Sequence, residues 1–497
     1  MHPKAIVIGS GIAGIASALR LRHKGYEVTV FEANSYVGGK LTVVEKGGYR
    51  WDAGPSLFTM PHLVDELFEL FGQDPKKYFD YHRKERICNY FWEDGSTFSA
   101  HADAETFIQE ASKSFNTSTE KLRQYLAKSR EKYDLTAGIF LEKSLHKWST
   151  YLSLETLKSF AQSFKLDIST SLDKVNKQYF TDPRLVQLFN RYATYNGSSP
   201  YQTPGIMSMI PHLEMHYGTF FPKGGMHEIS QSLYRLALDQ GIKFRLNEAV
   251  EKIQHTNGVA TGIVTAQGSF AAEMVVSNMD IFSTYKHLLK DVSHPRRILQ
   301  QERSSSALIF YWGIKKQFPE LDLHNIFFSQ NYEEEFRHIF KELDLFHDPT
   351  VYINITSKEE KRDAPQACEN WFVMINAPGN FEQNWEELKN RARQQIIDKL
   401  SRLLGEEIEP LIEVEEILDP VLIESKTSSH RGALYGSASN SQFAAFLRHP
   451  NFSNQLKNLY FCGGSVHPGG GIPLCLLSAK IVGDLIPAAV PPLEEVA

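Results

Sequence analysis

The sequence predicts an α/β protein, in which helices cover a parallel sheet, and three observations predict it. Residues 1–32 have the pattern of a strand, a glycine turn, a helix and a second strand. A strand, a glycine loop and a helix recur near the other end, at residues 459–486. The intervening residues change several times between strand and helix patterns. This order indicates two domains whose segments alternate along the chain.

The N-terminal motif joins two buried strands through a helix. Ala5 to Ile8 is apolar, as buried parallel strands are, and it runs directly into a glycine-rich turn. A helix is expected from Ile12 to Arg22 and a second strand from Glu27 to Phe31. Glu32 closes that strand, where its carboxylate would accept hydrogen bonds from a ribose diol. Together these elements predict a Rossmann-type dinucleotide-binding unit.

The glycines of the turn have separate physical tasks. Gly9 permits the tight turn, Gly11 lets a pyrophosphate approach the backbone, and Gly14 lets the helix pack against the strand. The free N–H groups of the helix N-terminus, at Ile12 and Ala13, would face the phosphates. The motif therefore predicts an adenine dinucleotide, with a chance glycine-rich turn as the alternative.

Two further short motifs suit a bound dinucleotide. The Gly38-Gly39-Lys40 turn exposes backbone N–H groups and adds a positive charge for a pyrophosphate, with an ordinary surface turn as the alternative. The small residues of the Gly54-Pro55-Ser56 segment would let a flat ring lie against the main chain. A turn that ends a strand explains this segment nearly as well.

The C-terminal glycine loop carries a stronger signal. Five glycines fall within residues 463–471, and such a run is costly in chain entropy unless the backbone approaches something bulky. Pro473 suits the first turn of the helix that follows. The positive end of that helix would stabilise the negative charge that develops on the N1–C2=O edge of a reduced flavin. A glycine-rich linker is the alternative.

Bulk composition fits a folded protein with a normal core. The 497 residues are 42% hydrophobic and 23% charged, and the net charge of -6 argues against a general nucleic-acid binder. The four cysteines follow no metal-binding or disulfide spacing, so we expect buried thiols in the reducing cytoplasm. No signal peptide and no apolar run of about 18 residues is evident, so any membrane contact would be peripheral.

With these motifs, and with Phe221-Pro222-Lys223-Gly224-Gly225-Met226, the chain resembles the bacterial carotenoid desaturases, which are phytoene-desaturase-like members of the FAD amine-oxidase superfamily. The resemblance covers nearly the whole length and is most specific from His467 to Pro473. It implies that FAD is the cofactor. It also implies FAD contacts at Gly9, Gly11, Ile12, Ala13, Gly14, Glu32, Gly39, Lys40, Gly54, Pro55, Ser56, Val250, Gly464, Gly471 and Ile472.

The resemblance gives several of these residues a particular task. Lys40 would lie near the phosphates, and Val250 would contact adenine through its main chain. Gly464, Gly471 and Ile472 would line the ribityl chain and the ring. Residues 1–85, 219–289 and 419–497 would form the Rossmann-type FAD-binding domain. Residues 86–218 and 290–418 would form an α+β domain that faces substrate and membrane.

Two departures from the phytoene desaturase pattern favour one branch of the family. Val466 stands where threonine is common, and Leu474 where glycine is frequent. Residues 52–61 also differ from the usual aromatic version. These features resemble the hydroxycarotenoid 3,4-desaturases, which implies 3,4-desaturation of a 1-hydroxycarotenoid. The alternatives are a phytoene desaturase, another oxidase of the superfamily that acts on an amine or porphyrinogen, and a non-enzymatic escort of prenylated proteins.

The sequence shows no convincing acid–base pair. His467 is the tempting candidate for a base, but its glycine and proline neighbours suit a structural turn better. The electron acceptor that reoxidises the flavin is equally open.

Membrane contact is an expectation that follows from the implied substrate. A long polyene is held in lipid by about 0.8 kcal/mol per buried CH₂, so the enzyme must take it from a bilayer, at the cytoplasmic face. Five apolar residues at helical spacing could form either a packed helix or a surface that admits lipid: Leu154, Leu157, Ala161, Phe164 and Ile168.

Overall fold

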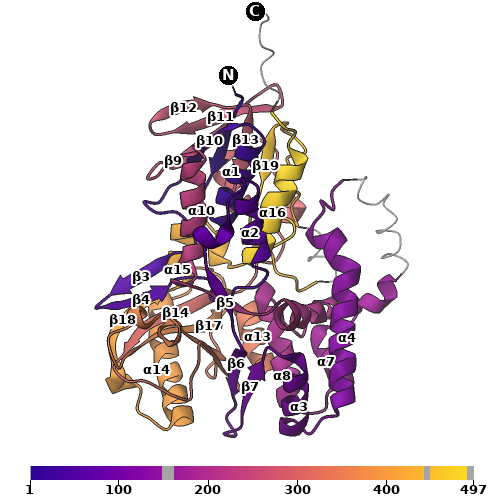
Figure 1. Cartoon of the computed structure of the whole chain (residues 1–497), viewed down its shortest axis with the longest axis vertical. Helices are drawn as coiled ribbons and strands as arrows, with labels where there is room; N and C mark the ends of the chain where they lie inside the picture. The colour runs from indigo at the N-terminus through magenta and orange to yellow at the C-terminus, as the bar shows by residue number, and fades with distance from the viewer. Residues whose placement is uncertain (1, 148–161, 442–447, 490–497) are drawn as a thin grey trace, which may run out of the picture.

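The computed structural model describes residues 2–147, 162–441 and 448–489. Figure 1 shows two layered parts, one above the other, with the N-terminal strand and the C-terminal helix together in the upper part. Within the described residues each part is built on its own sheet. The chain passes between the two parts several times.

The upper part contains a parallel five-stranded sheet of order β19-β13-β1-β2-β9. All neighbouring strands pair in parallel, with Ile8 opposite both Phe31 and Ser277. The strands are β1 (Lys4–Ile8), β2 (Glu27–Phe31), β9 (Lys243–Arg245), β13 (Met274–Ser277) and β19 (Leu459–Phe461). Strands from three distant stretches of chain are thus neighbours in one sheet, which confirms the predicted α/β fold.

Helices and a small sheet cover this parallel sheet. The helix α1 (Ile12–His23) lies against α10 (His227–Asp239) and α16 (Ile472–Leu485), and α2 (His62–Glu69) packs beside them. The core between them is continuous, and α1 contributes nine buried residues to it. An antiparallel sheet follows β9 and consists of β10 (Val250–Thr256), β11 (Val259–Thr265) and β12 (Gly268–Ala271).

The lower part contains a seven-stranded sheet of order β18-β14-β17-β16-β15-β6-β7. Its pairs are antiparallel except for β15 with β6. The strands are β6 (Arg86–Phe91), β7 (Thr97–His101), β14 (Ser306–Ile314), β15 (His324–Phe327), β16 (Val351–Ile355), β17 (Glu369–Ala377) and β18 (Ile412–Leu418). Every one of them comes from residues 86–218 or 290–418, although the exact domain boundaries stay a prediction.

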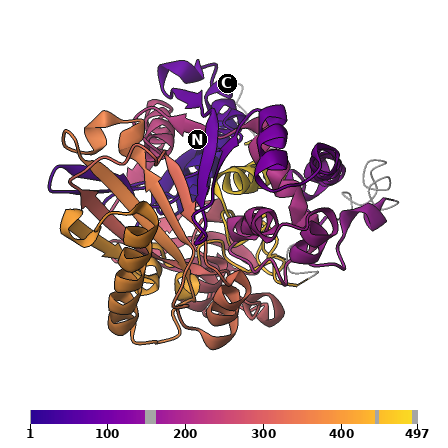
Figure 2. The same cartoon turned by 90° about the horizontal axis from the view of Figure 1, so that it is seen from below.

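The two faces of the seven-stranded sheet have different partners. Leu308, Phe310 and Trp312 alternate along β14 and pack against the helix α14 (Trp385–Leu404). Figure 2 shows α14, in orange-brown, along one side of this sheet and the purple helices across the molecule. Those helices are α3 (Ala104–Ser114), α4 (Thr119–Thr136), α7 (Leu172–Tyr179) and α8 (Pro183–Asn190). The face opposite α14 is turned toward the upper part.

Short hairpins and strand pairs join the two parts. The strand β3 (Val43–Lys46) pairs with β4 (Tyr49–Asp52), and β5 (Tyr81–Arg83) pairs with β8 (Phe220–Pro222). The remaining α-helices of four or more residues in the described ranges are α12 (Arg296–Leu299), α13 (Tyr332–Arg337) and α15 (Pro420–Thr427). None of the helices in these ranges is both long and apolar enough to cross a bilayer. Of the expected helix at residues 154–168, Leu154, Leu157 and Ala161 lie outside the described residues.

Candidate functional site: a dinucleotide cradle facing the seven-stranded sheet

Two glycine motifs that are distant in sequence lie side by side at the carboxyl end of β1. Gly11 and Gly38 form a parallel bridge, and the Gly38 N–H donates to the Ser10 carbonyl at 2.9 Å. A Cβ on Gly39 would lie 3.3 Å from the Gly11 Cα. The first N–H groups of α1, at Ile12 and Ala13, have no acceptor within the helix. The structure thus brings the first turn and the Gly38-Gly39-Lys40 motif together as one backbone surface.

Close backbone contacts explain why two of the predicted site residues, Gly14 and Gly54, are glycines. A Cβ on Gly14 would lie 2.1 Å from the Gly9 carbonyl oxygen, so the helix approaches the turn more closely than any other residue allows. A Cβ on Gly54 would lie 1.9 Å from the Lys40 carbonyl oxygen. Gly9 itself has φ of 91°, which a residue with a side chain rarely adopts. Both close contacts are between protein atoms. They require glycine at Gly14 and Gly54 whether or not a cofactor is bound.

Glu32 ends β2 beside this turn and is only 6% exposed. Its Oε2 accepts from the Ser10 N–H and the Ser10 hydroxyl, both at 2.8 Å. Its Oε1 accepts from the N–H and the side-chain amide of Asn34, at 2.9 and 2.8 Å. Two backbone donors fix the carboxylate, while the two side-chain donors can rotate away and leave lone pairs for a ribose diol. The position therefore fits the predicted role.

Val250 begins β10 close to this acidic residue. The Glu248 N–H donates to the Glu32 carbonyl at 2.8 Å, and the Asn247 N–H donates to the Asn34 carbonyl at 3.0 Å. These bonds tie the chain before β10 to the end of β2. The main chain of Val250 consequently lies at the same end of the site as the ribose position.

Asn278 is a residue of the site that the sequence reading missed. It follows β13, and its side-chain amide donates to the Cys462 carbonyl at 3.1 Å. A Cβ on Gly11 would lie 2.7 Å from its Oδ1, and a Cβ on Gly463 would lie 2.5 Å from its Nδ2. Asn278 therefore packs between the first and the last glycine loops. Its place at the carboxyl end of a parallel strand is the signal that sequence reasoning had available.

Two cations lie deep in the site without a carboxylate bonded to either within the described residues. The Lys40 ammonium donates to the carbonyls of Ala433 and Leu434, both at 3.1 Å. The Arg448 guanidinium donates to the carbonyls of Tyr435 and Gly464, at 2.8 and 3.1 Å. Burial lowers the pKa of Lys40 to about 8 and that of Arg448 to about 10. This arrangement favours an anionic ligand, because a buried cation is costly until a negative charge neutralises it.

The C-terminal glycine loop leaves room where the flavin was expected. Gly471 caps α16 with φ of 100°, and a Cβ built on it would meet no protein atom within 4 Å. Gly464 and Gly471 keep accessible surface, whereas Ile472 is buried beneath them. Burial raises the pKa of the nearby Cys475 thiol to about 11, so it stays protonated and is no nucleophile. An open cradle at the positive end of a helix fits the electron-rich edge of a flavin.

The segment from Ala53 to Ser56 faces the second sheet. The Tyr311 hydroxyl donates to the Ala53 carbonyl at 2.7 Å, and the Ser56 and Tyr352 hydroxyls lie 2.8 Å apart. Gly54, Pro55 and Ser56 keep accessible surface although their neighbours on both sides include buried residues. The predicted ring-binding segment thus lies between the dinucleotide cradle and the seven-stranded sheet.

His467 has the structural environment that its neighbours predicted. Its Nε2 lies 2.9 Å from the Lys143 carbonyl, and its own carbonyl accepts from the Asn451 amide at 2.8 Å. Burial lowers the pKa of His467 to about 4, far from the value near neutrality that suits a general base. The catalytic base is accordingly not assigned to this residue.

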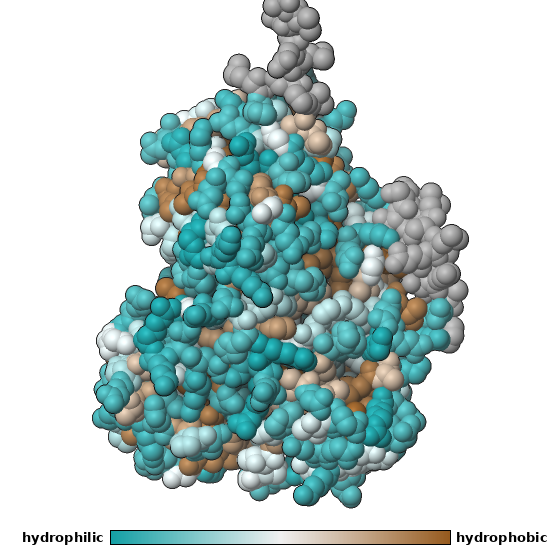
Figure 3. All heavy atoms as spheres, in the orientation of Figure 1, coloured by the Kyte–Doolittle hydropathy of each residue, from teal (hydrophilic) through white to brown (hydrophobic). Residues whose placement is uncertain are grey.

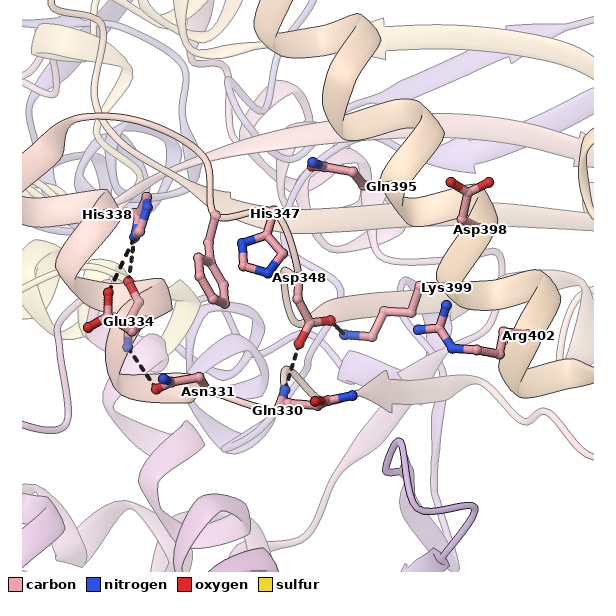
Figure 4. Close-up of a pocket in the computed structure, with 11 residues that line it drawn as sticks. Gln330, Asn331, Glu334, His338, His347, Asp348, Gln395, Asp398, Lys399 and Arg402 are labelled. Atoms are coloured by element: carbon pink, nitrogen blue, oxygen red, sulfur yellow. Dashed lines mark hydrogen bonds and ion pairs between the residues drawn. The ribbon is translucent and has the colours of Figure 1, made fainter.

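A cavity of about 770 Å³ lies elsewhere, between α13 and α14 on the far side of the seven-stranded sheet (Figure 4). Polar side chains and Phe346 line it, and several of its charged groups are paired: Lys399 with Asp348, Arg402 with Glu93, and His338 with Glu334. None of the predicted cofactor residues lines it. This cavity is a solvated surface hollow and is distinct from the cradle.

The cradle and its opposing sheet define the class of the protein: an oxidoreductase that binds a dinucleotide cofactor against a separate substrate domain. The chain belongs to the flavin-containing amine oxidoreductase family, which it matches over residues 12–486. The cofactor is therefore FAD, as the motifs predicted. The free N–H groups, the two cations that form no ion pair within the described residues and the open space at Gly471 all fit that group.

Individual relatives support the same family. The chain is 59% identical, over 97% of its length and 99% of the relative, to a 1-hydroxycarotenoid 3,4-desaturase of Flavobacterium sp. (strain P99-3). It is 33% identical, over 98% of each chain, to a 4,4'-diapolycopene oxygenase of Methylomonas sp.. Among solved structures, the cyclohexylamine oxidase of Brevibacterium oxydans IH-35A aligns over 98% of each chain with a TM-score of 0.62 and 14% identity, which shows a shared fold.

The position of Glu32 gives a first testable prediction. Replacing Glu32 with Ala should weaken FAD binding by about 10- to 150-fold, because hydrogen bonds to a charged group contribute about 1.5–3 kcal/mol. The matched control is Glu27→Ala, on the same strand, whose exposed carboxylate pairs with Lys243. Fluorescence titration of the apoprotein with FAD measures both. Equal affinities for the two variants would contradict the ribose role.

The open space at Gly471 gives a second prediction. Gly471→Ala should lose bound flavin, because its methyl group would occupy the cradle. The control is Gly268→Ala, which has a comparable φ of 132° and equally open space but lies in the remote β12. Both variants carry about 1–3 kcal/mol of backbone strain, so both should melt earlier. Flavin content per protein separates them, and normal flavin in Gly471→Ala would show that the loop is only a connector.

Proposed function

We propose that the protein is a carotenoid desaturase that forms the 3,4 double bond of a 1-hydroxycarotenoid. The 59% identity to a relative of that name, over nearly the full length of both chains, is the observation that carries the proposal. The amine oxidases share only 14–16% identity with this chain, and that similarity extends to the fold alone. An amine oxidase or a non-enzymatic escort is correspondingly less well supported than a desaturase.

The wall opposite the cradle suits a hydrocarbon substrate. Along the face of the seven-stranded sheet opposite α14, one row across four strands consists of Ile309, Met374, Tyr352 and Ile326, of which only Tyr352 is polar. Met374 keeps accessible surface, and its flexible thioether can adapt to an irregular apolar chain. When bound, FAD supplies the hydride acceptor for an oxidation of this kind. The contribution of the protein is to exclude water and to hold an apolar chain between the sheet and residues 53–57.

We further propose peripheral contact with the cytoplasmic face of a membrane, because a polyene of this length is held in lipid. A hollow of about 190 Å³ opens beside the end of α16. It is lined by Lys143, Lys147, Ile481 and Leu485, together with Glu142, Ser144 and Asp484. Apolar side chains reach the surface at the junction of the upper and lower parts, between α16 and α4 (Figure 3). The aliphatic groups favour a lipid surface, and each of the two lysines adds attraction for anionic headgroups, which Glu142 and Asp484 oppose.

Substrate choice tests the proposed reaction. In direct competition, the flavin-loaded enzyme should turn over a 1-hydroxycarotene faster than phytoene and should add one double bond beside the hydroxylated end. Chromatography with absorption spectra of the products measures the ratio. Faster turnover of phytoene, with several double bonds introduced, would assign the protein to the phytoene desaturases and leave its FAD site intact.

Vesicle flotation tests the membrane proposal. The protein should float with vesicles that contain anionic lipid, and Lys147→Glu should lower the bound fraction about fivefold or more, because each lysine near such a surface contributes about 1 kcal/mol. The matched control is Lys121→Glu. Lys121 is an exposed lysine near the N-terminal end of α4. A wild-type protein that never floats, yet desaturates carotene supplied in vesicles, would contradict this docking.

A further inference from the structure

Three polar side chains form a hydrogen-bonded row on the apolar face of the seven-stranded sheet. The Ser56 and Tyr352 hydroxyls lie 2.8 Å apart, and the Tyr352 hydroxyl lies 2.7 Å from His324 Nδ1. The rings of His324 and Tyr352 are nearly parallel, with 21° between their planes. Because β15 and β16 are neighbours, the row extends from the middle of the sheet to the segment after β4. It thus reaches the residues expected to approach the flavin ring.

The hydrogen atoms of this row point in one direction. The Asn354 amide donates to His324 Nδ1 at 3.2 Å, so Nδ1 is an acceptor. Tyr352 must therefore donate its hydroxyl hydrogen to Nδ1, and Ser56 must donate to Tyr352. Burial lowers the pKa of His324 to about 3, which keeps the ring neutral and its hydrogen on Nε2. As a result, the lone pairs of the Ser56 hydroxyl accept no hydrogen bond from the described residues, and Ser56 keeps accessible surface.

The histidine end of the row also has unused hydrogen-bonding capacity. His324 is 4% exposed, and its Nε2 has no partner among the described residues. A buried donor without an acceptor is costly, so its retention calls for an explanation. Ser56 and Tyr352, in contrast, keep accessible surface, while the adjoining Tyr311 and Phe372 are buried. The row therefore places accessible polar groups beside the apolar side chains of Ile326 and Met374.

Another polar cluster near this sheet is largely satisfied by its own members. Arg191 and Glu214 form a buried ion pair with an N···O distance of 2.9 Å. The Glu214 carboxylate also accepts from the hydroxyls of Tyr192 and Tyr195, and Arg191 lies over the Tyr192 ring. Three side chains thus saturate one carboxylate through four hydrogen bonds, which stabilises the fold but leaves the carboxylate little capacity for a ligand. Ser56, at the edge of the cradle, has that capacity.

We propose that Ser56, Tyr352 and His324 form the receptor for the hydroxyl group of the substrate's end. This inference rests on the proposed function and extends it to the recognition of an alcohol at one end of a polyene. In a 1-hydroxycarotenoid a single carbon lies between the hydroxylated carbon and the nearer carbon of the 3,4 bond. A receptor beside the ring-binding segment therefore holds the reacting bond at the flavin. A hydroxyl brought into an apolar cavity without such a partner would lose binding energy.

The test compares two ligands on three flavin-loaded proteins. The ligands are a 1-hydroxycarotene and the same carotene without the hydroxyl, and the proteins are wild type, Tyr352→Phe and Tyr90→Phe. Tyr90 is a matched control, because it lies on the same sheet face, opposite Ile326, and its hydroxyl has no partner among the described residues. Quenching of protein fluorescence gives the affinities, and steady-state kinetics gives kcat and KM.

Tyr352→Phe should weaken binding of the hydroxylated ligand about tenfold and raise its KM by a similar factor, with kcat changed less. Its affinity for the hydroxyl-free carotene should stay unchanged, and Tyr90→Phe should bind both ligands as wild type does. Ser56→Ala, on a different element, should reproduce the selective loss and covers a failure of Tyr352→Phe to fold. The proposal would be overturned if Tyr352→Phe lost affinity equally for both ligands. It would also be overturned if Tyr90→Phe alone lost affinity selectively for the hydroxylated ligand.

The same measurements separate this inference from the proposed function. If wild type turns over neither carotene, the desaturase proposal fails and the receptor fails with it. If wild type prefers the hydroxylated ligand and both Tyr352→Phe and Ser56→Ala keep that preference, only the receptor is overturned.

Discussion

Close backbone packing at the carboxyl end of β1 is the constraint on which the rest of the structure depends. Gly14 approaches the Gly9 carbonyl more closely than a residue with a Cβ allows, so α1 can begin only there. Asn278 then fills the gap between the first and last glycine loops and bonds to the end of β19. Three stretches of chain that are hundreds of residues apart are thereby fixed around the dinucleotide cradle.

The chemistry of the cradle comes from the side chains and backbone groups of these three stretches. Lys40 and Arg448 bring two positive charges that bond only to carbonyls in the described structure, and Gly471 leaves open space at the positive end of α16. An anionic dinucleotide compensates the buried charge, which couples cofactor binding to stability. On the opposite side, the Tyr311 hydroxyl donates to the Ala53 carbonyl and so holds this segment against the seven-stranded sheet. The seven-stranded sheet and the cradle are consequently joined through residues 53–56.

Local patterns were enough to predict the elements that build the cradle. The strand at Ala5–Ile8, the glycine spacing after it and the helix near Leu474 are all encoded within a few residues, so the fold class and FAD were predictable. The partners of the site depend instead on long-range register. His324 meets Tyr352 only because β15 pairs with β16, and Arg448 lies in irregular chain that has no local signature. Lys40 is an example of both cases. The Gly38-Gly39-Lys40 motif could be recognised in the sequence. The hydrogen bonds of its ammonium to the Ala433 and Leu434 carbonyls could not be predicted from any sequence spacing.

The most direct measurement of the central claim is anaerobic mixing of the FAD-loaded protein with one equivalent of a 1-hydroxycarotene in a stopped-flow spectrophotometer. If the cradle holds the flavin against the substrate wall, the oxidised flavin absorbance should disappear at the same rate as the absorbance of the lengthened polyene appears. A flavin that stays oxidised while the carotene is bound would contradict the account, because the two walls would then not bring cofactor and substrate together.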